Sequence, residues 1–290
     1  MEPLAIPTAK QLPAKLEPVD LSGRTILVTG ASGGFGRALA IDCGRAGASV
    51  VLAGRNGAKL DRLYDEIVAL GAPQPAIVQL DLASATAQDY DRLSDTIDRE
   101  FGKLDGLVHA AALLGDRTPL EQYDVPTWCR VLHVNLTAPF ILTQVLLPNL
   151  RKSSDASVIF VSSSVARKPR AYWGAYAVSK AGLEALREML TQELEGKENI
   201  RFNALCPGPL NTPLLQDWLG DDQAKRQRRE IHFPMGRFGE AIEQAQAVLF
   251  LASNESSFVN GTDFVVDGGM TRAYVTAEGP ATVGPQNFAR

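Results

Sequence analysis

The stretch "ILVTGASGGFGRALA", residues 26–40, joins an apolar run to a helical pattern through a turn that contains Gly30, Gly33, Gly34 and Gly36. Glycine lets the backbone of such a turn approach a phosphate closely. The following helix then offers unpaired N–H groups and the positive end of its dipole. A glycine turn that only begins the helix is the alternative. The position between a strand and a helix favours a binding site for the pyrophosphate of a dinucleotide.

Strand-like and helix-like segments alternate along the rest of the chain. Strands are expected near residues 25–29, 49–53, 76–80, 106–110, 157–162, 200–205 and 263–266, and helices near 34–47, 57–70, 86–102, 125–149, 174–195 and 240–252. This alternation predicts an α/β protein with a doubly wound Rossmann fold, a seven-stranded parallel sheet flanked by helices in a single domain. Ligands of such sheets bind beyond the carboxyl ends of the strands.

The expected domain spans residues 21–270. A Pro-rich extension, residues 1–20, precedes it, and a tail, residues 271–290, follows it. Residues 209–235 interrupt the alternation and are long for a connector, so we expect a lid over the substrate, with an ordinary surface excursion as the alternative.

Composition narrows the class of partner. The chain has 290 residues and a net charge of −4, which does not favour nucleic acid. Its 3 cysteines are far apart and have no metal-ligand spacing, so no metal is expected. There is no signal-peptide core, and no apolar run is seen to approach the length of a membrane span. We expect a soluble, cytoplasmic protein with no membrane partner.

The candidate chemical centre lies in "AYAVSKAGLEAL", residues 175–186, where Tyr176 and Lys180 share one helical face. Ser163 lies upstream, in a serine run at the end of the strand "SVIFV". A solvated helix face would explain the Tyr-x3-Lys pair alone. Tyrosine has an ordinary pKa of about 10, which is too high for an efficient base at neutral pH. The positive charges of a nearby ammonium and of an oxidised nicotinamide ring would both favour the phenolate form and so lower this pKa. Ser163 would then hydrogen-bond the substrate oxygen.

Two sets of residues resemble the short-chain dehydrogenase/reductase family: Thr29, Gly30, Gly34 and Gly36 in the loop, and Ser163, Tyr176 and Lys180 at the centre. The resemblance covers roughly residues 21–270. It implies that Asn135, inside the apolar stretch "RVLHVNLTAPF", distorts its helix and holds a water that links Lys180 to solvent. The implied catalytic residues are Asn135, Ser163, Tyr176 and Lys180.

The resemblance also implies the cofactor contacts. Pro207, Gly208 and Thr212 would lie beside the nicotinamide, and Asp81 with Leu82 would lie at the adenine. The expected cofactor-binding residues are Gly30, Ser32, Gly33, Gly34, Phe35, Gly36, Arg55, Asp81, Leu82, Ala110, Ala111, Tyr176, Lys180, Pro207, Gly208 and Thr212.

One segment departs from the family pattern. Residues 109–112 read His-Ala-Ala-Ala where the family usually has Asn-Asn-Ala-Gly. We expect His109 to be structural rather than catalytic, because an imidazole can supply one of the bonds that an asparagine amide makes between strands.

The end of the second strand bears on cofactor choice. About 20 residues after the glycine loop, an acid that accepts the ribose 2′-hydroxyl of NAD is expected, but Gly54 and Arg55 stand there. Arg55 can form two hydrogen bonds to a 2′-phosphate. We therefore expect NADP(H) rather than NAD(H), with a solvent-facing turn arginine as the alternative.

The resulting hypothesis is an NADP(H)-dependent oxidoreductase that interconverts a carbonyl and a secondary alcohol, with Tyr176 as acid and base. A 3-oxoacyl-carrier-protein or CoA reductase, a sugar or polyol dehydrogenase and a non-catalytic nucleotide-binding scaffold remain alternatives. Basic side chains near the centre would favour an anionic substrate if they border its mouth, namely Arg167, Lys168, Arg170, Lys225, Arg226, Arg228 and Arg229. Tyr172, Trp173, Leu214 and Trp218 could line the pocket. The resemblance alone implies a homotetramer.

Overall fold

The computed structural model describes residues 19–194, 199–213, 215–216, 220, 226, 230, 233–272, 275–276 and 279–280. Residues 1–18 of the expected N-terminal extension, much of the expected lid and most of the tail lie outside the described residues. So do five side chains expected at the substrate side, those of Leu214, Trp218, Lys225, Arg228 and Arg229.

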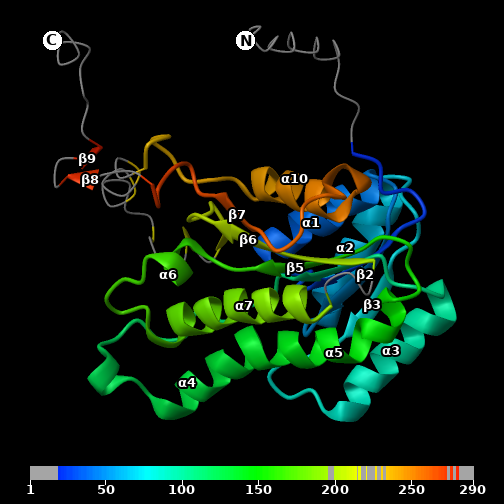
Figure 1. Ribbon diagram of the computed structural model, residues 1–290, viewed down its shortest axis with the longest axis horizontal. Helices are drawn as coiled ribbons and strands as arrows, with labels where there is room; N and C mark the ends of the chain where they lie inside the picture. The colour runs from blue at the N-terminus through cyan, green and yellow to red at the C-terminus, as the bar shows by residue number, and fades with distance from the viewer. Residues whose placement is uncertain are drawn as a thin grey trace, which may run out of the picture.

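A seven-stranded sheet forms the centre of the molecule (Figure 1). Its order is β3-β2-β1-β4-β5-β6-β7, and all six pairings are parallel. The strands are β1 (Thr25–Thr29), β2 (Ser49–Gly54), β3 (Ala76–Gln79), β4 (Gly106–His109), β5 (Ala156–Val161), β6 (Ile200–Pro207) and β7 (Asp263–Val266). The order reverses between β1 and β4, which is where a doubly wound sheet binds its ligand. The predicted fold class is confirmed.

Helices cover both faces of the sheet (Figure 1). One layer contains α1 (Gly34–Arg45), α2 (Gly57–Ala69) and α10 (Ala241–Ala252). The other contains α3 (Ala87–Phe101), α4 (Val125–Leu132), α5 (Ala138–Leu150) and α7 (Gly174–Glu193). Shorter pieces complete the described chain: α6 (Ser164–Arg167), the 3-10 turns η1 (Leu120–Gln122) and η3 (Asn254–Ser256), and the hairpin β8 (Val275–Thr276) with β9 (Gly279–Pro280).

The strand sequences explain why both faces are covered. Ile26 and Val28 belong to the apolar cluster under α1, whereas Leu27 between them belongs to the cluster under α3 and α5. Successive side chains of a strand point to opposite faces, so a continuous apolar run needs a helical layer on each side.

The helix expected over residues 125–149 is more elaborate. It consists of α4, one π-helical turn η2 (His133–Thr137) and α5. Together they form a run of 26 residues whose most apolar window has a mean hydropathy of 1.4. By length and composition alone this helix could cross a membrane, so the expectation that no apolar run approaches a membrane span is wrong. Leu142, Leu146 and Leu150 are fully buried in the core, which accounts for one apolar side of this helix.

Candidate active site

The glycine loop is shaped by two close backbone approaches. Gly30 has a φ of +66°, and a Cβ there would lie 2.8 Å from Ala111 Cα. A Cβ on Gly36 would lie 2.3 Å from the carbonyl oxygen of Gly30. Gly33 is the N-cap of α1, and no side chain caps the helix there. No side chain therefore accepts hydrogen bonds from the first N–H groups of α1, which lie at the open end of the sheet.

Thr29 has a role that we did not foresee. Its Oγ1 accepts hydrogen bonds from the N–H groups of Ala110 (3.0 Å) and Ala111 (3.2 Å), and it lies 3.3 Å from the Val108 carbonyl oxygen. This hydroxyl joins the ends of β1 and β4 at the point where the strand order reverses. It fixes the backbone that borders the cofactor cavity.

His109 is buried beside this junction. Its ring stacks on Phe160 with centroids 4.9 Å apart, and its Nε2 lies 2.8 Å from Thr143 Oγ1. Burial, assisted by the nearby charge of Lys180, lowers the pKa of His109 to about 3. A neutral imidazole in these contacts fits the expected structural role.

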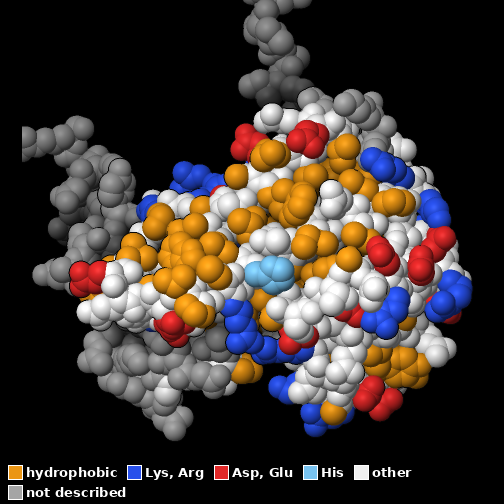
Figure 2. Space-filling model, turned by 90° about the horizontal axis from the view of Figure 1, so that it is seen from below, with side chains coloured by type: hydrophobic (Ala, Val, Ile, Leu, Met, Phe, Trp, Pro, Cys, Tyr) orange, Lys and Arg blue, Asp and Glu red, His pale blue; other side chains and the backbone are white. Residues whose placement is uncertain are grey.

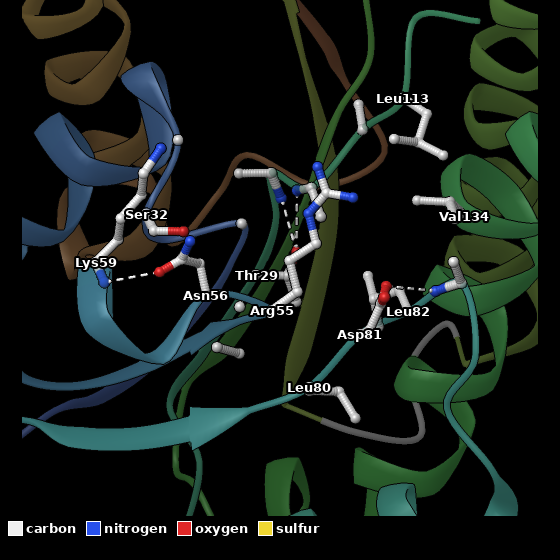
Figure 3. Close-up of a pocket in the computed structure, with 18 residues that line it drawn as sticks. Thr29, Ser32, Arg55, Asn56, Lys59, Leu80, Asp81, Leu82, Leu113 and Val134 are labelled. Carbon is white, nitrogen blue, oxygen red and sulfur yellow. Dashed lines mark hydrogen bonds between the residues drawn. The ribbon is translucent and has the colours of Figure 1, made fainter. Parts of the chain in front are cut away.

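A cavity of about 340 Å³ opens beyond the ends of β1, β2, β3 and β4 (Figure 3). Figure 3 shows Arg55 between Ser32, Asn56 and Lys59 on one side and Leu113 and Val134 on the other. Its lining includes eight expected cofactor residues: Gly30, Ser32, Gly33, Arg55, Asp81, Leu82, Ala110 and Ala111. The other lining residues are Thr29, Ala53, Gly54, Asn56, Lys59, Leu80, Ala83, Ala112, Leu113 and Val134.

The cavity is basic where it meets the start of α2. Asn56 caps this helix by accepting the N–H of Lys59 at 3.0 Å, which places the side chains of Arg55 and Lys59 at the same rim. Among the described residues that line the cavity, Asp81 is the one acid. Lys59 was not among our expected residues, although its spacing four residues after Arg55 at a helix start is visible in the sequence.

The predicted catalytic side chains are brought together beside the end of β5. Tyr176 and Lys180 lie on α7, and the Lys180 Nζ is 5.7 Å from the centre of the Tyr176 ring. Lys180 donates to the Val161 carbonyl at 2.6 Å. Ser163 caps α6 directly after β5, and its side chain hydrogen-bonds to Tyr176.

Burial dominates the protonation of this group. It raises the pKa of Tyr176, while the hydrogen bond with Ser163 opposes that increase. It also lowers the pKa of Lys180 to about 8, because an ammonium loses its hydration there. In the protein alone the tyrosine is therefore held as the neutral phenol, and the expected shift toward phenolate depends on a further positive charge.

Asn135 lies in the π-helical turn η2 and is fully buried. Its amide accepts from the Leu113 N–H at 2.8 Å and donates to the Leu113 carbonyl at 2.9 Å. It also donates to Ser179 Oγ at 3.0 Å. The expected helix distortion is present, and the amide ties the segment after β4 to α7, the helix of Tyr176 and Lys180.

The segment after β6 approaches the glycine loop from the other side. A Cβ on Gly34 would lie 3.2 Å from Thr212 Cβ and 3.0 Å from Pro213 Cδ. Gly208 packs closely on Asp267, because a Cβ there would lie 2.9 Å from Asp267 Cα. Thr212, expected beside the nicotinamide, thus lies near the start of α1.

Four of the seven basic side chains that could border the substrate mouth lie among the described residues. Arg167 forms ion pairs with Glu184 and Asp263, so its charge is already balanced within the protein. Arg226 pairs with Glu230 at 2.9 Å. Lys168 and Arg170 are exposed.

Trp173 packs against Tyr176, with the two ring centroids 5.7 Å apart. The Arg117 guanidinium lies 4.4 Å from the Trp173 ring centre. Arg117 was not foreseen, because no local pattern connects residue 117 with residue 173.

The fold and these contacts define an α/β oxidoreductase with a dinucleotide site next to a Ser-Tyr-Lys group. The family model described as enoyl-(acyl carrier protein) reductase matches residues 30–271. The chain belongs to the short-chain dehydrogenase/reductase family.

Three relatives illustrate this membership. The uncharacterized oxidoreductase YciK of Escherichia coli K12 is 42% identical over 194 residues, 67% of this chain and 76% of that protein. The 3-oxoacyl-[acyl-carrier-protein] reductase FabG of Thermotoga maritima is 33% identical over 254 residues, 86% of this chain and 98% of that protein. A short-chain dehydrogenase from Escherichia coli CFT073, solved in complex with NADPH, is 35% identical with a TM-score of 0.77 and covers 86% of this chain and 99% of its own.

Proposed function

We propose that this protein is an NADP(H)-dependent oxidoreductase that interconverts a carbonyl compound and a secondary alcohol. The observation that carries the proposal is the contact of Ser163, Tyr176 and Lys180 at the end of β5, beside the same sheet end as the cavity. This reaction needs a hydroxyl group that acts as the acid, a hydrogen-bond donor for the substrate oxygen, and an ammonium.

The cavity fits a phosphorylated dinucleotide. Gly30 and Gly36 allow the close backbone packing that shapes the loop, and the start of α1 offers N–H groups to a pyrophosphate. Arg55, with Lys59 beside it, would hold the 2′-phosphate, and Ser32 would add a hydroxyl. Asp81 and Leu82 would border the adenine. The NADPH bound to the Escherichia coli CFT073 relative supports this assignment.

When bound, the cofactor supplies or accepts the hydride at the substrate carbon. Tyr176 donates a proton to the carbonyl oxygen during reduction and removes it during oxidation. Ser163 donates a hydrogen bond to the same oxygen as negative charge develops there. Lys180 stabilises the phenolate form of Tyr176 and would hold the ribose hydroxyls.

Tyr176 must regain its proton after each reduction. We assign this to a relay in which a water held at Asn135 passes a proton to Lys180, and Lys180 passes one on to Tyr176. The π-helical turn η2 supports the assignment, because it leaves the regular helical hydrogen-bond pattern at this residue. The amide of Asn135 is occupied by Leu113 and Ser179, so its main-chain carbonyl is the group that would hold the water.

The FabG relative keeps 3-oxoacyl-thioester reduction as the first specific candidate. A sugar or polyol dehydrogenase is the second. A panel of 3-oxoacyl thioesters, simple ketones, aldoses and polyols, assayed by nicotinamide absorbance, discriminates these activities from one another. A protein that binds NADPH and turns over no member of the panel would be a nucleotide-binding scaffold.

The expected lid and oligomer are also part of the proposal. Phe233 and Phe238 pack with Met270, which anchors the end of the segment 209–235 near β7.

Figure 2 looks onto the layer of α3, α4, α5 and α7 and shows hydrophobic side chains gathered over it. Phe140 on α5 and Val178 and Met189 on α7, two helices of this layer, are 43%, 50% and 57% exposed. A cytoplasmic homotetramer would cover this face, and light scattering after size-exclusion chromatography tests the assembly.

A further inference from the structure

Glu184 is a partly buried acid that the mechanism above does not use. It lies one helical turn after Lys180 on α7, and its side chain is 15% exposed. Its Oε1 accepts a hydrogen bond from Ser162 Oγ at 2.7 Å and another from Cys206 Sγ at 3.3 Å. One carboxylate oxygen therefore joins α7 to two neighbouring strands of the sheet.

Each of the two donors directly precedes a segment of the candidate site. Ser162 directly precedes Ser163, and Cys206 directly precedes the Pro207-Gly208 turn. Both donors are almost completely buried. Ser162 Oγ also lies 3.4 Å from the Lys180 carbonyl oxygen, so its hydroxyl is held between two groups of α7. The ends of β5 and β6 are thus fixed to α7 immediately before the segments that would contact substrate and nicotinamide.

The second oxygen of Glu184 faces a cation. Arg167 Nε lies 3.5 Å from Oε2, and the same guanidinium bonds to Asp263 on β7. Arg187 also approaches Asp263, at 3.2 Å. The negative charge of Glu184 is thereby balanced, and a hydrogen bond to a charged acceptor is stronger and shorter than a neutral one.

We propose that Glu184 is a positioning residue, which fixes Ser163 and the Pro207-Gly208 turn relative to Tyr176 and Lys180. The proposal rests on the proposed function. Glu184 touches none of the reacting atoms and acts through Ser162 and Cys206. Removing its carboxylate leaves the buried Cys206 thiol without its acceptor and Ser162 with only the long contact to the Lys180 carbonyl, so the strand ends shift to find new partners.

A metal site is the competing interpretation, because oxygen and sulfur ligand atoms of Glu184, Cys206 and Asp263 lie within 4.8 Å of one another. Two guanidinium groups already pair with these carboxylates, and they would have to be displaced by an ion. We therefore favour the positioning role and measure metal content as part of the test.

The first experiment measures turnover and NADPH binding separately in the full-length protein. Glu184→Leu removes both acceptor oxygens, Glu184→Gln keeps one, and Ser162→Ala removes one donor. Glu188→Leu, on the exposed face of the next turn, is the matched control. We expect Glu184→Leu to lower kcat by about 100-fold, since small displacements of catalytic groups have effects of this size. The Kd of NADPH should change by less than about threefold, and Glu184→Gln should restore most of the lost kcat.

Combining Ser162→Ala with Glu184→Leu should cost little more than Glu184→Leu alone, because both remove the same contact. A kcat of Glu184→Leu equal to that of Glu188→Leu, or independent losses that multiply in the double variant, would overturn the proposal. So would a stoichiometric metal in the parent protein that is lost in Glu184→Gln.

The second experiment does not need turnover. Hydrogen–deuterium exchange with NADPH bound should become at least about threefold faster in Glu184→Leu for the peptides around residues 157–168 and 200–210, and stay unchanged around β1 and β2. Unchanged exchange in the first two peptides would contradict the positioning role. A parent protein that turns over no substrate would instead contradict the proposed function, and the exchange result would still decide the role of Glu184.

Discussion

The Lys180 ammonium lies 5.7 Å from the centre of the Tyr176 ring, and both side chains project from the same face of α7. The lysine is fully buried, and its ammonium donates a hydrogen bond to the carbonyl of Val161 at the end of β5. A buried cation next to a phenol has a cost in stability and a use in catalysis, and both can be measured.

The stability cost of Lys180 depends on pH. Burial lowers its pKa to about 8 from 10.5, so between these values the unfolded chain binds more protons, and stability rises as pH rises. At pH 7 the full cost is present. We expect Lys180→Met to raise the free energy of unfolding of the cofactor-free protein by about 1–2 kcal/mol at pH 7 and to abolish turnover. Urea unfolding at pH 7 and pH 10 measures this, and a gain that fails to shrink at the higher pH would disagree with it.

His109 gives a second pH dependence. Its pKa falls to about 3 from 6.5 on folding, so the unfolded chain binds more protons between these values. Stability should therefore fall as pH falls through 6.5 toward 3, by up to about 1.4 kcal/mol per pH unit from this group. His109→Asn should flatten the slope of unfolding free energy against pH in that range and leave NADPH affinity intact. Identical slopes for the two proteins would show that His109 is not the group responsible.

Arg55 selects the cofactor if it holds the 2′-phosphate. We expect Arg55→Ala to raise the KM for NADPH by about tenfold or more and to leave the KM for NADH nearly unchanged, because only NADPH carries the phosphate. Arg62→Ala, at an exposed position on α2, is the control and should affect neither cofactor. Equal effects of Arg55→Ala on both cofactors would show that Arg55 is a solvent-facing residue that does not select the cofactor.

Gly36 is required by the contact between α1 and the end of β1. A Cβ there would lie 2.3 Å from the Gly30 carbonyl oxygen, so Gly36→Ala should lower stability by about 2 kcal/mol and weaken NADPH binding. At Gly57 the nearest atom is the end of the Gln79 side chain, at 3.3 Å. Gly57→Ala should therefore change stability by less than about 0.5 kcal/mol. Thermal unfolding with and without NADPH compares the two variants, and similar losses in both would argue against the steric explanation.

The sequence was sufficient where local patterns determine the geometry. The alternation of apolar runs gave the parallel sheet, and a four-residue helical spacing placed Tyr176 beside Lys180. Ser163 could be placed because it belongs to a serine run that follows a strand whose carboxyl end belongs to the binding edge, 13 residues before Tyr176. Their contact follows from these two facts together.

Contacts between distant segments could not be foreseen. No local pattern indicated the ion pair between Arg167 and Asp263, because Asp263 lies on β7 and only the pairing of β5, β6 and β7 brings the two together. The link from Glu184 to Ser162 and Cys206 depends on the same register. Thr29 was recognised as part of a motif, but its bonds to Ala110 and Ala111 require the adjacency of β1 and β4.

The most direct test of the account is the rate of NADPH oxidation by the parent protein and by Tyr176→Phe, measured over the carbonyl panel with NADH in parallel. The account predicts at least one carbonyl substrate that is reduced faster with NADPH than with NADH. It further predicts that Tyr176→Phe lowers this rate by about 100-fold or more, because the phenol is the proton donor. A Tyr176→Phe variant that turns over the same substrate as fast as the parent would contradict the central claim.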